Sequence, residues 1–159
     1  MSRLEPGAKA PSFTLLDQTG TKRSLSALLK DAPGEGIVLF VYPAAMTPGC
    51  TKEACDFRDS LTALRAAGWQ PVGLSPDAVP KQAAFAAKES LDYPLLSDAD
   101  RGVLTAYGAY GEKSMYGRTT IGVIRSTFAI GKNGKIVGAW YAIKATGHVA
   151  RLMRDLGVA

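Results

Sequence analysis

Two cysteines are the residues of this chain whose type and spacing could do chemistry. Cys50 and Cys55 are separated by four residues, and the rest of the 159-residue chain contains no other cysteine. A thiolate is both a nucleophile and a metal ligand. In a reducing compartment, a close cysteine pair is more often catalytic or metal-binding than structural. Four uses of the pair therefore have to be compared: a zinc site, a dithiol exchanger, simple burial, and a nucleophile with a resolving partner.

The ligand count and the spacing argue against the first two uses. A zinc site needs four ligands at short paired spacings, whereas the single histidine, His148, lies far from the cysteines in sequence. We therefore predict no metal, and we expect His148 to lie at the surface or to cap a helix. Cys-x-x-Cys exchangers have two residues between the cysteines rather than four. For Cys55, burial as a small hydrophobic residue stays open.

The fourth use makes Cys50 the nucleophile and Cys55 its resolving partner. We expect Cys50 at the start of a helix, where unpaired N–H groups and the positive end of the helix dipole favour a thiolate. The dipole contributes only about 0.3 to 1 kcal/mol, so a nearby cation has to assist it. Donors that stabilise charge as a bond breaks are also needed. Thr47, three residues before Cys50, could supply a hydroxyl.

The elements that would position these residues alternate between strand and helix. The apolar, β-rich run at residues 37–42 predicts a central strand that is covered on both faces. Apolar side chains at three- and four-residue spacings predict a helix over residues 51–67. The same reasoning predicts a strand at 72–74, a helix at 79–91, an extended segment at 93–96 and a helix at 102–107. Such alternation favours parallel strands joined by helical crossovers.

Both ends of the chain carry hairpin patterns. Near the start, two β-rich segments at residues 13–16 and 21–25 flank a glycine-containing turn, which predicts an N-terminal β-hairpin. Later, Asn133 and Gly134 lie between two β-rich runs, which predicts a second hairpin at the edge of the sheet. A final helix is predicted over residues 146–156. The sequence therefore indicates an α/β fold with a βαβ unit, a ββα unit and an added N-terminal hairpin.

Length and composition indicate one globular domain. The 159 residues, 47% of them hydrophobic and 21% charged, fit a single domain of ordinary size. No stretch approaches the roughly 18 apolar residues of a membrane span, and the start lacks the apolar core of a secretory signal, so we expect a cytoplasmic protein. The 19 basic residues are dispersed among 14 acidic ones, which argues against a nucleic-acid partner despite the net charge of +5.

The segment around Cys50 resembles a known family signature. Residues 43–50, PAAMTPGC, match the Pro-x-x-x-Thr-x-x-Cys motif of peroxiredoxins. Residues 47–55, TPGCTKEAC, are similar to the PrxQ branch of that family, which is also called bacterioferritin comigratory protein. Further segments that look like landmarks of the family lie at residues 10–13, 74–77, 94–98 and 125–128. The resemblance therefore extends along the whole chain.

This resemblance implies a fold and an activity. The fold would be a thioredoxin-like sheet of the peroxiredoxin type with helices on both sides, and residues 1–159 would form a single AhpC/TSA-type domain. The activity would be the reduction of hydrogen peroxide and organic hydroperoxides in antioxidant defence. Thioredoxin would be the usual electron donor, with no metal and no bound organic cofactor. Relatives of this kind are often monomeric, so we expect a monomer or a dimer.

The resemblance also assigns roles to individual residues. Cys50 would be the peroxidatic cysteine, with Thr47 and Arg125 as its activating and peroxide-binding partners. Pro43 would shield the pocket. An arginine suits this role because its forked, always-charged guanidinium can serve both a thiolate and a peroxide oxygen.

The remaining assignments concern residues next to the motif. Gly49 and Glu53 would belong to the substrate-binding surroundings, with Glu53 orienting the arginine. Ala44 and Ala45 stand where PrxQ sequences commonly carry charged or polar residues. The rim of the pocket is therefore expected to be less polar than usual, which leaves the substrate preference open.

Helix geometry implies that the cysteine pair has to move in order to react. If residues 50–55 form a continuous helix, the five-residue rise of about 7.5 Å exceeds the roughly 7 Å limit for the Cα atoms of a disulfide. The helix would have to unwind before Cys50 and Cys55 could pair. Some relatives place the resolving cysteine in the following helix, but residues 82–88 contain none. Cys55 is then the only candidate within the chain.

Two other functions on the same fold stay open at this point. One is a thiol–disulfide oxidoreductase that reduces protein disulfides and ignores peroxide. The other is a redox-sensing binding module that signals through the disulfide without steady turnover. The speed of oxidation by peroxide separates a peroxidase from both.

Overall fold

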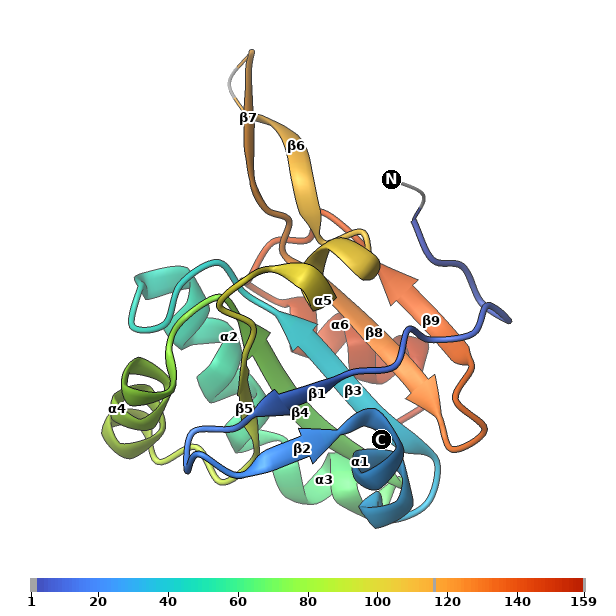
Figure 1. Cartoon of the computed structure of the whole chain (residues 1–159). Helices are drawn as coiled ribbons and strands as arrows, with labels where there is room; N and C mark the ends of the chain where they lie inside the picture. Colours follow the sequence, from blue (N-terminus) through green and yellow to red (C-terminus); the bar gives the residue numbers. More distant parts are fainter. Residues whose placement is uncertain (1–2, 116, 159) are drawn as a thin grey trace.

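The computed structural model describes residues 3–115 and 117–158. Its strands are β1 (Thr14–Leu16), β2 (Lys22–Ser24), β3 (Gly36–Val41), β4 (Trp69–Ser75), β5 (Leu95–Ser97), β6 (Tyr110–Met115), β7 (Arg118–Val123), β8 (Ser126–Gly131) and β9 (Ile136–Trp140). Its helices are α1 (Leu25–Asp31), α2 (Pro48–Asp59), α3 (Leu61–Ala66), α4 (Val79–Glu89), α5 (Gly102–Ala106) and α6 (His148–Asp155). Figure 1 shows how these elements are arranged.

Seven of the strands form one mixed sheet. Their order is β2-β1-β5-β4-β3-β8-β9. β3, β4 and β5 run parallel to one another, whereas β8 is antiparallel to β3 and β1 is antiparallel to β5. The parallel strands are connected through α2, α3 and α4, as the alternating sequence pattern predicts.

The side chains of β3 alternate between two apolar clusters on opposite faces of the sheet. Leu39 and Val41 belong to the cluster that α1 and α5 cover. Val38 and Phe40 belong to the other cluster, which α2, α3, α4 and α6 cover. All six residues of β3 are buried, which explains why the strand reads as an uninterrupted apolar run.

The main features expected of the fold are confirmed. β1 and β2 form the N-terminal hairpin, and β8 and β9 form the second hairpin with β9 at one edge of the sheet. The strand expected to be central, β3, lies between β4 and β8. The βαβ and ββα units thus give the helix-flanked mixed sheet that a thioredoxin-like fold requires.

Some element predictions were wrong or incomplete. The helix expected over residues 51–67 begins earlier, at Pro48, and is divided into α2 and α3 at Ser60. Pro48 suits the first turn because that position needs no N–H partner. The short helix α1 and the β6–β7 hairpin were not predicted. That hairpin projects from the body of the protein (Figure 1), so most of β7 is exposed and lacks a core-facing pattern.

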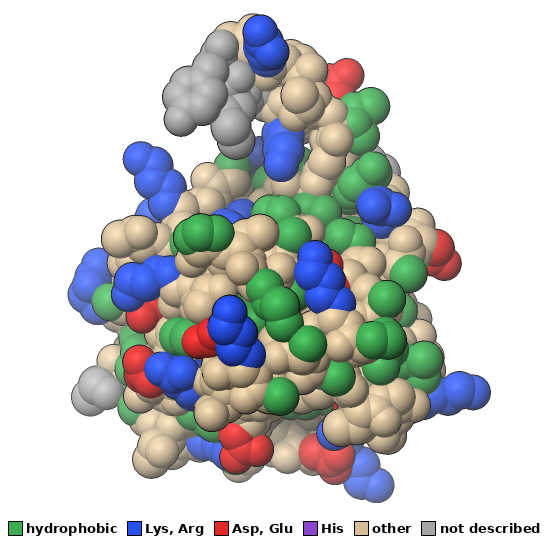
Figure 2. All heavy atoms as spheres, turned by 90° about the vertical axis from the view of Figure 1, so that its left-hand side faces the viewer, with side chains coloured by type: hydrophobic (Ala, Val, Ile, Leu, Met, Phe, Trp, Pro, Cys, Tyr) green, Lys and Arg blue, Asp and Glu red, His purple; other side chains and the backbone are tan. Residues whose placement is uncertain are grey.

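The face of the protein drawn in Figure 2 has no large region in which all the charged side chains carry the same sign. Basic and acidic side chains are interspersed there with small apolar groups. This agrees with the dispersed charges of the sequence. Among the described residues, no helix is long and apolar enough to cross a membrane.

Candidate active site

Cys50 lies in the first turn of α2, just beyond the carboxyl end of β3. Thr47 is the N-cap residue, Pro48 begins the helix, and the Cys50 side chain is buried, with 1% of its surface exposed. A thiol in this position is surrounded by helix N–H groups and by the positive end of the helix dipole. The expected placement of Cys50 at a helix start is therefore confirmed.

A strained loop connects β3 to this helix. Met46 has a positive φ of 68°, which is uncommon for a residue with a side chain. Asp77 holds the loop from the neighbouring segment after β4, because its Oδ2 accepts a hydrogen bond from the Ala45 N–H at 2.7 Å. The Ser75 hydroxyl donates to the same oxygen at 2.7 Å. This network fixes the path of the chain into α2.

Arg125 is the cation that contacts Cys50. A terminal nitrogen of its guanidinium, Nη2, donates to the Cys50 Sγ at 3.3 Å, and Nη1 donates to the Glu53 Oε1 at 2.7 Å. The sheet register explains the meeting of residues 75 positions apart: Arg125 immediately precedes β8, whose first residue pairs with the last residue of β3. The forked side chain thus bridges the sulfur and the carboxylate.

Gly49 provides the space that this arginine needs. A Cβ atom at position 49 would lie 3.3 Å from the Arg125 Nη2 and 3.8 Å from the Ala145 Cβ. The first of these distances is shorter than an ordinary van der Waals contact, so a larger residue would press on the guanidinium. Gly49 therefore acts on the site through Arg125, which is a more specific role than the sequence predicted.

Glu53 is fully buried beneath Arg125. Burial raises the pKa of Glu53 to about 7, although the Arg125 guanidinium opposes the shift. Its second oxygen, Oε2, has no hydrogen-bond partner among the described residues. Because Nη1 of Arg125 bonds to Glu53 while Nη2 bonds to the Cys50 sulfur, Glu53 holds the guanidinium in place beside the sulfur.

Thr47 and Pro43 lie in the segment between β3 and Cys50. The Thr47 hydroxyl donates to the Ala44 carbonyl at 2.8 Å, and no hydrogen bond joins it to Cys50 in the described part of the chain. Thr47 is exposed and Pro43 is half-buried. A hydroxyl that donates its proton to a carbonyl still has lone pairs that can accept a bond from a bound peroxide.

Cys55 lies one and a half turns further along the same helix. Both cysteines are free thiols, and α2 is continuous between them. The Cys55 thiol is half-buried and donates to the Glu89 Oε1 at 3.6 Å. Burial and the Glu89 carboxylate raise the pKa of Cys55, against the opposing effect of Arg58. We call α2 the closed helix while it is continuous between the two cysteines. In the closed helix, Cys55 is therefore held as a thiol, away from Cys50.

Two hydrogen bonds attach the cysteine segment of α2 to neighbouring elements. The buried Tyr93 hydroxyl donates to the Ala54 carbonyl at 2.6 Å. Arg58 donates to the Glu89 carbonyl at 2.7 Å and so caps the last turn of α4. The Tyr93 bond has to break or shift if the helix between the cysteines unwinds, because Ala54 lies between them. Sequence patterns did not indicate Tyr93, Arg58 or Glu89, because their partners are backbone groups or distant residues.

We predict that Tyr93→Phe speeds disulfide formation. The change removes a hydrogen bond that exists only in the closed helix, and such a bond contributes about 1 kcal/mol, so the step after sulfenic acid should accelerate roughly five-fold. Stopped-flow fluorescence or rapid thiol trapping measures that step. Tyr107→Phe is the matched control, because the Tyr107 hydroxyl donates to the Pro11 carbonyl at 2.7 Å in the other apolar cluster. Equal rates in the two variants would contradict the role of Tyr93.

His148 was predicted to lie at the surface or to cap a helix, and the surface placement is wrong. It is the first residue of α6, but its side chain is buried, and Nε2 lies 2.8 Å from the Thr127 hydroxyl oxygen. Burial lowers the pKa of His148 to about 4. The apolar face of α6 draws the imidazole inward, and Thr127 supplies its polar partner. In the described residues, no group of three potential metal-binding side chains comes together.

Comparison with known proteins places this geometry in a family. The AhpC/TSA family model matches residues 6–139. A protein of Mycobacterium tuberculosis that is named as a peroxiredoxin is 57% identical over 157 residues, which is 99% of this chain and 98% of that protein. The crystal structure of peroxidoxin BcpB from M. tuberculosis has a TM-score of 0.84 and 41% identity, and covers 98% of this chain and 97% of its own.

A second similar solved structure belongs to a protein that is described by its reaction. The bacterioferritin comigratory protein of Xanthomonas campestris, described in terms of alkyl peroxide reduction, has a TM-score of 0.82 and 34% identity. The match covers 91% of this chain and 90% of that one. The chain is thus similar over nearly its full length to proteins of one branch.

Proposed function

Since the chain belongs to the AhpC/TSA family and the relatives compared above are peroxiredoxins, we propose that it is a thiol-dependent peroxidase that reduces hydrogen peroxide and organic hydroperoxides. The observation that carries the proposal is the 3.3 Å contact between the Arg125 guanidinium and the Cys50 sulfur inside the first turn of a helix. This arrangement stabilises a thiolate and places hydrogen-bond donors beside it.

The first step is nucleophilic attack by Cys50. Its thiolate attacks the terminal oxygen of the hydroperoxide, and an S–O bond forms as the O–O bond breaks. The sulfur is oxidised to sulfenic acid, and the peroxide is reduced to an alkoxide or hydroxide, which takes up a proton and leaves as alcohol or water. Arg125 stabilises the negative charge that develops on the oxygens. Thr47 is proposed to accept a hydrogen bond from the hydroperoxide, and Pro43 to shield the pocket from water.

The second step joins the two cysteines. The helix between them unwinds, the Cys55 sulfur attacks the Cys50 sulfenic sulfur, an S–S bond forms and water is released. An external dithiol of the thioredoxin type then reduces the disulfide by exchange. The closed helix supports this order of events, because it separates the thiols while Cys50 reacts with peroxide.

The surroundings of the site favour hydroperoxides with an apolar substituent. Met46 is 39% exposed, Ala44 is half-buried and Ala45 is buried, so the loop before α2 presents apolar side chains beside the site. The family relationship supports thioredoxin as the electron donor. We further propose that residues 1–159 act as one domain, since the seven-stranded sheet joins β1 and β2 near the start of the chain to β8 and β9 near its end. We also propose that the protein works as a monomer or dimer in the cytoplasm.

Mass spectrometry after addition of one equivalent of hydroperoxide tests this function. The reduced protein should lose two hydrogens, and trapping with a thiol reagent should find neither cysteine free, because the product is an internal disulfide. Stopped-flow measurement should show that oxidation is far faster than that of free cysteine. Oxidation no faster than free cysteine, together with rapid reduction of protein disulfides, would instead identify a thiol–disulfide oxidoreductase.

A further inference from the structure

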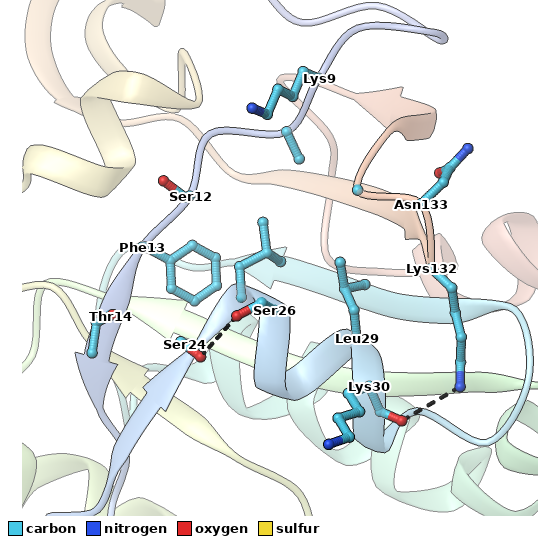
Figure 3. A pocket seen from close by; sticks show the side chains of 13 residues that line it. Lys9, Ser12, Phe13, Thr14, Ser24, Ser26, Leu29, Lys30, Lys132 and Asn133 are labelled. Carbon is cyan, nitrogen blue, oxygen red and sulfur yellow. Dashed lines mark hydrogen bonds between the residues drawn. The ribbon is translucent and has the colours of Figure 1, made fainter.

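A cavity lies away from the cysteines. It has a volume of about 690 Å³ and is formed by the segment before β1, by α1 and by the turn between β8 and β9 (Figure 3). Its lining residues are Lys9, Ala10, Ser12, Phe13, Thr14, Ser24, Leu25, Ser26, Leu29, Lys30, Lys132, Asn133 and Gly134. This volume lies in the range of about 300 to 1,000 Å³ that is typical of small-molecule sites.

The floor of this cleft is apolar and its rim is polar. Phe13, Leu25 and Leu29 are more than nine-tenths buried and belong to the apolar cluster beneath α1. Ser12 and Ser26 contribute hydroxyl groups above them. A floor that is part of the packed core is rigid, so the cleft is largely formed before anything binds.

The charges on the lining have one sign. Lys9, Lys30 and Lys132 line the cleft, and no aspartate or glutamate does. None of the three makes an ion pair with any residue described in the structure. In Figure 3, Lys9 lies on one side of the apolar floor, whereas Lys30 and Lys132 lie on the other. The only hydrogen bond drawn for the Lys132 ammonium is a long one to the Lys30 carbonyl, at 3.5 Å.

The cleft is separate from the peroxidatic site. Lys132 follows β8, and its N–H donates to the Glu35 carbonyl at 3.1 Å, just before the start of β3. Cys50 lies beyond the opposite end of β3, and a six-residue strand is about 20 Å long. A molecule in this cleft therefore does not meet the Cys50 sulfur, and it is not the hydroperoxide that reacts there.

We propose that this cleft binds a small organic anion with an apolar body. The carboxylate or phosphate group of the ligand pairs with Lys30 and Lys132, which lie on the same side of the floor, and its apolar part covers Phe13, Leu25 and Leu29. A neutral apolar molecule would remove water from the lysine ammonium groups without giving them a counter-charge, which is unfavourable. A small inorganic anion would pair with the lysines but would leave the apolar floor in contact with water. Only a ligand with both an anionic group and an apolar body matches both the lysines and the apolar floor.

Titration calorimetry of the reduced, full-length protein with decanoate, decyl phosphate and decanol tests this proposal. The two anions should bind about ten-fold more tightly than decanol, since exposed ion pairs to two lysines together contribute about 1.4 kcal/mol. The decanoate and decyl phosphate titrations distinguish a carboxylate ligand from a phosphate ligand. Amide shifts in nuclear magnetic resonance spectra should be confined to the lining of the cleft.

One variant tests the lysines and another tests the cleft itself. The triple variant Lys9→Gln, Lys30→Gln and Lys132→Gln should lose the ten-fold preference for anions. The control triple variant Lys22→Gln, Lys88→Gln and Lys144→Gln, with the same net charge, should keep it. Ser26→Trp, which fills the cleft from its exposed rim, should weaken all three ligands. Equal binding of decanol and decanoate, equal losses in the two triple variants, or amide shifts outside the cleft would overturn the proposal.

Discussion

Replacement of Cys50 with serine should abolish hydroperoxide reduction with every electron donor. A serine hydroxyl is not ionised near neutral pH, so neither the helix start nor Arg125 can turn it into a comparable nucleophile. The residual rate should be that of the uncatalysed reaction, measured as peroxide consumption coupled to thioredoxin and its reductase. Because serine is slightly smaller than cysteine and the site is buried, the variant should fold, which circular dichroism can verify.

Cys55→Ser is the matched control for this change. It keeps Cys50 and Arg125, so the first step should proceed at the normal rate and consume about one equivalent of peroxide before the enzyme stalls as sulfenic acid. Quantitative peroxide assays and mass spectrometry distinguish one turnover from many. Steady thioredoxin-linked turnover by Cys55→Ser would remove Cys55 from the resolving role, and measurable turnover by Cys50→Ser would remove Cys50 from the chemistry.

The parts of the fold that follow from local patterns could be predicted from the sequence. The buried run of β3, the Asn133-Gly134 turn and the helical spacing after Cys50 each carry their own signal. The expected thioredoxin-like arrangement follows from these elements. The β6–β7 hairpin gave no such signal, because strands that project into solvent need no alternating core face.

The candidate site shows the same division between local and distant information. The helical spacing of apolar residues after Cys50 predicted the helix start, but nothing local indicates that Asp77 holds the Ala45 N–H or that Tyr93 binds the Ala54 carbonyl. These contacts join residues more than 30 positions apart through backbone groups, which leave no pattern in the sequence. The burial of His148 was missed for a similar reason, since its partner, Thr127, lies in β8.

Substitution of Arg125 should have the next largest effect after loss of Cys50. Arg125→Gln removes the cation that contacts the Cys50 sulfur and a donor to the developing charge on the peroxide oxygens. Removing one donor of this kind from a buried site typically costs about 100- to 1,000-fold in rate. The second-order rate constant for oxidation by hydrogen peroxide, measured by stopped flow, should fall by about that amount.

The chemistry of the side chain, rather than charge alone, should account for part of this loss. Arg125→Lys keeps a positive charge, but an ammonium group cannot span both Glu53 and Cys50 as the forked guanidinium does, so we expect a loss of about ten-fold. Arg125→Gln also leaves Glu53 buried without its partner, which destabilises the fold. The double variant Arg125→Gln with Glu53→Gln relieves that imbalance, and it should remain as slow as the single variant.

A surface arginine serves as the control for these changes. Arg65 bonds to Gln70 and to the Asp92 carbonyl, far from the cysteines, so Arg65→Gln should oxidise at the rate of the unmodified protein. If a well-folded double variant of Arg125 and Glu53 reacted with peroxide as fast as the Arg65 variant, the guanidinium would have no part in the reaction. The helix start alone would then have to sustain the thiolate, and a dipole contribution of about 1 kcal/mol is too small to do so.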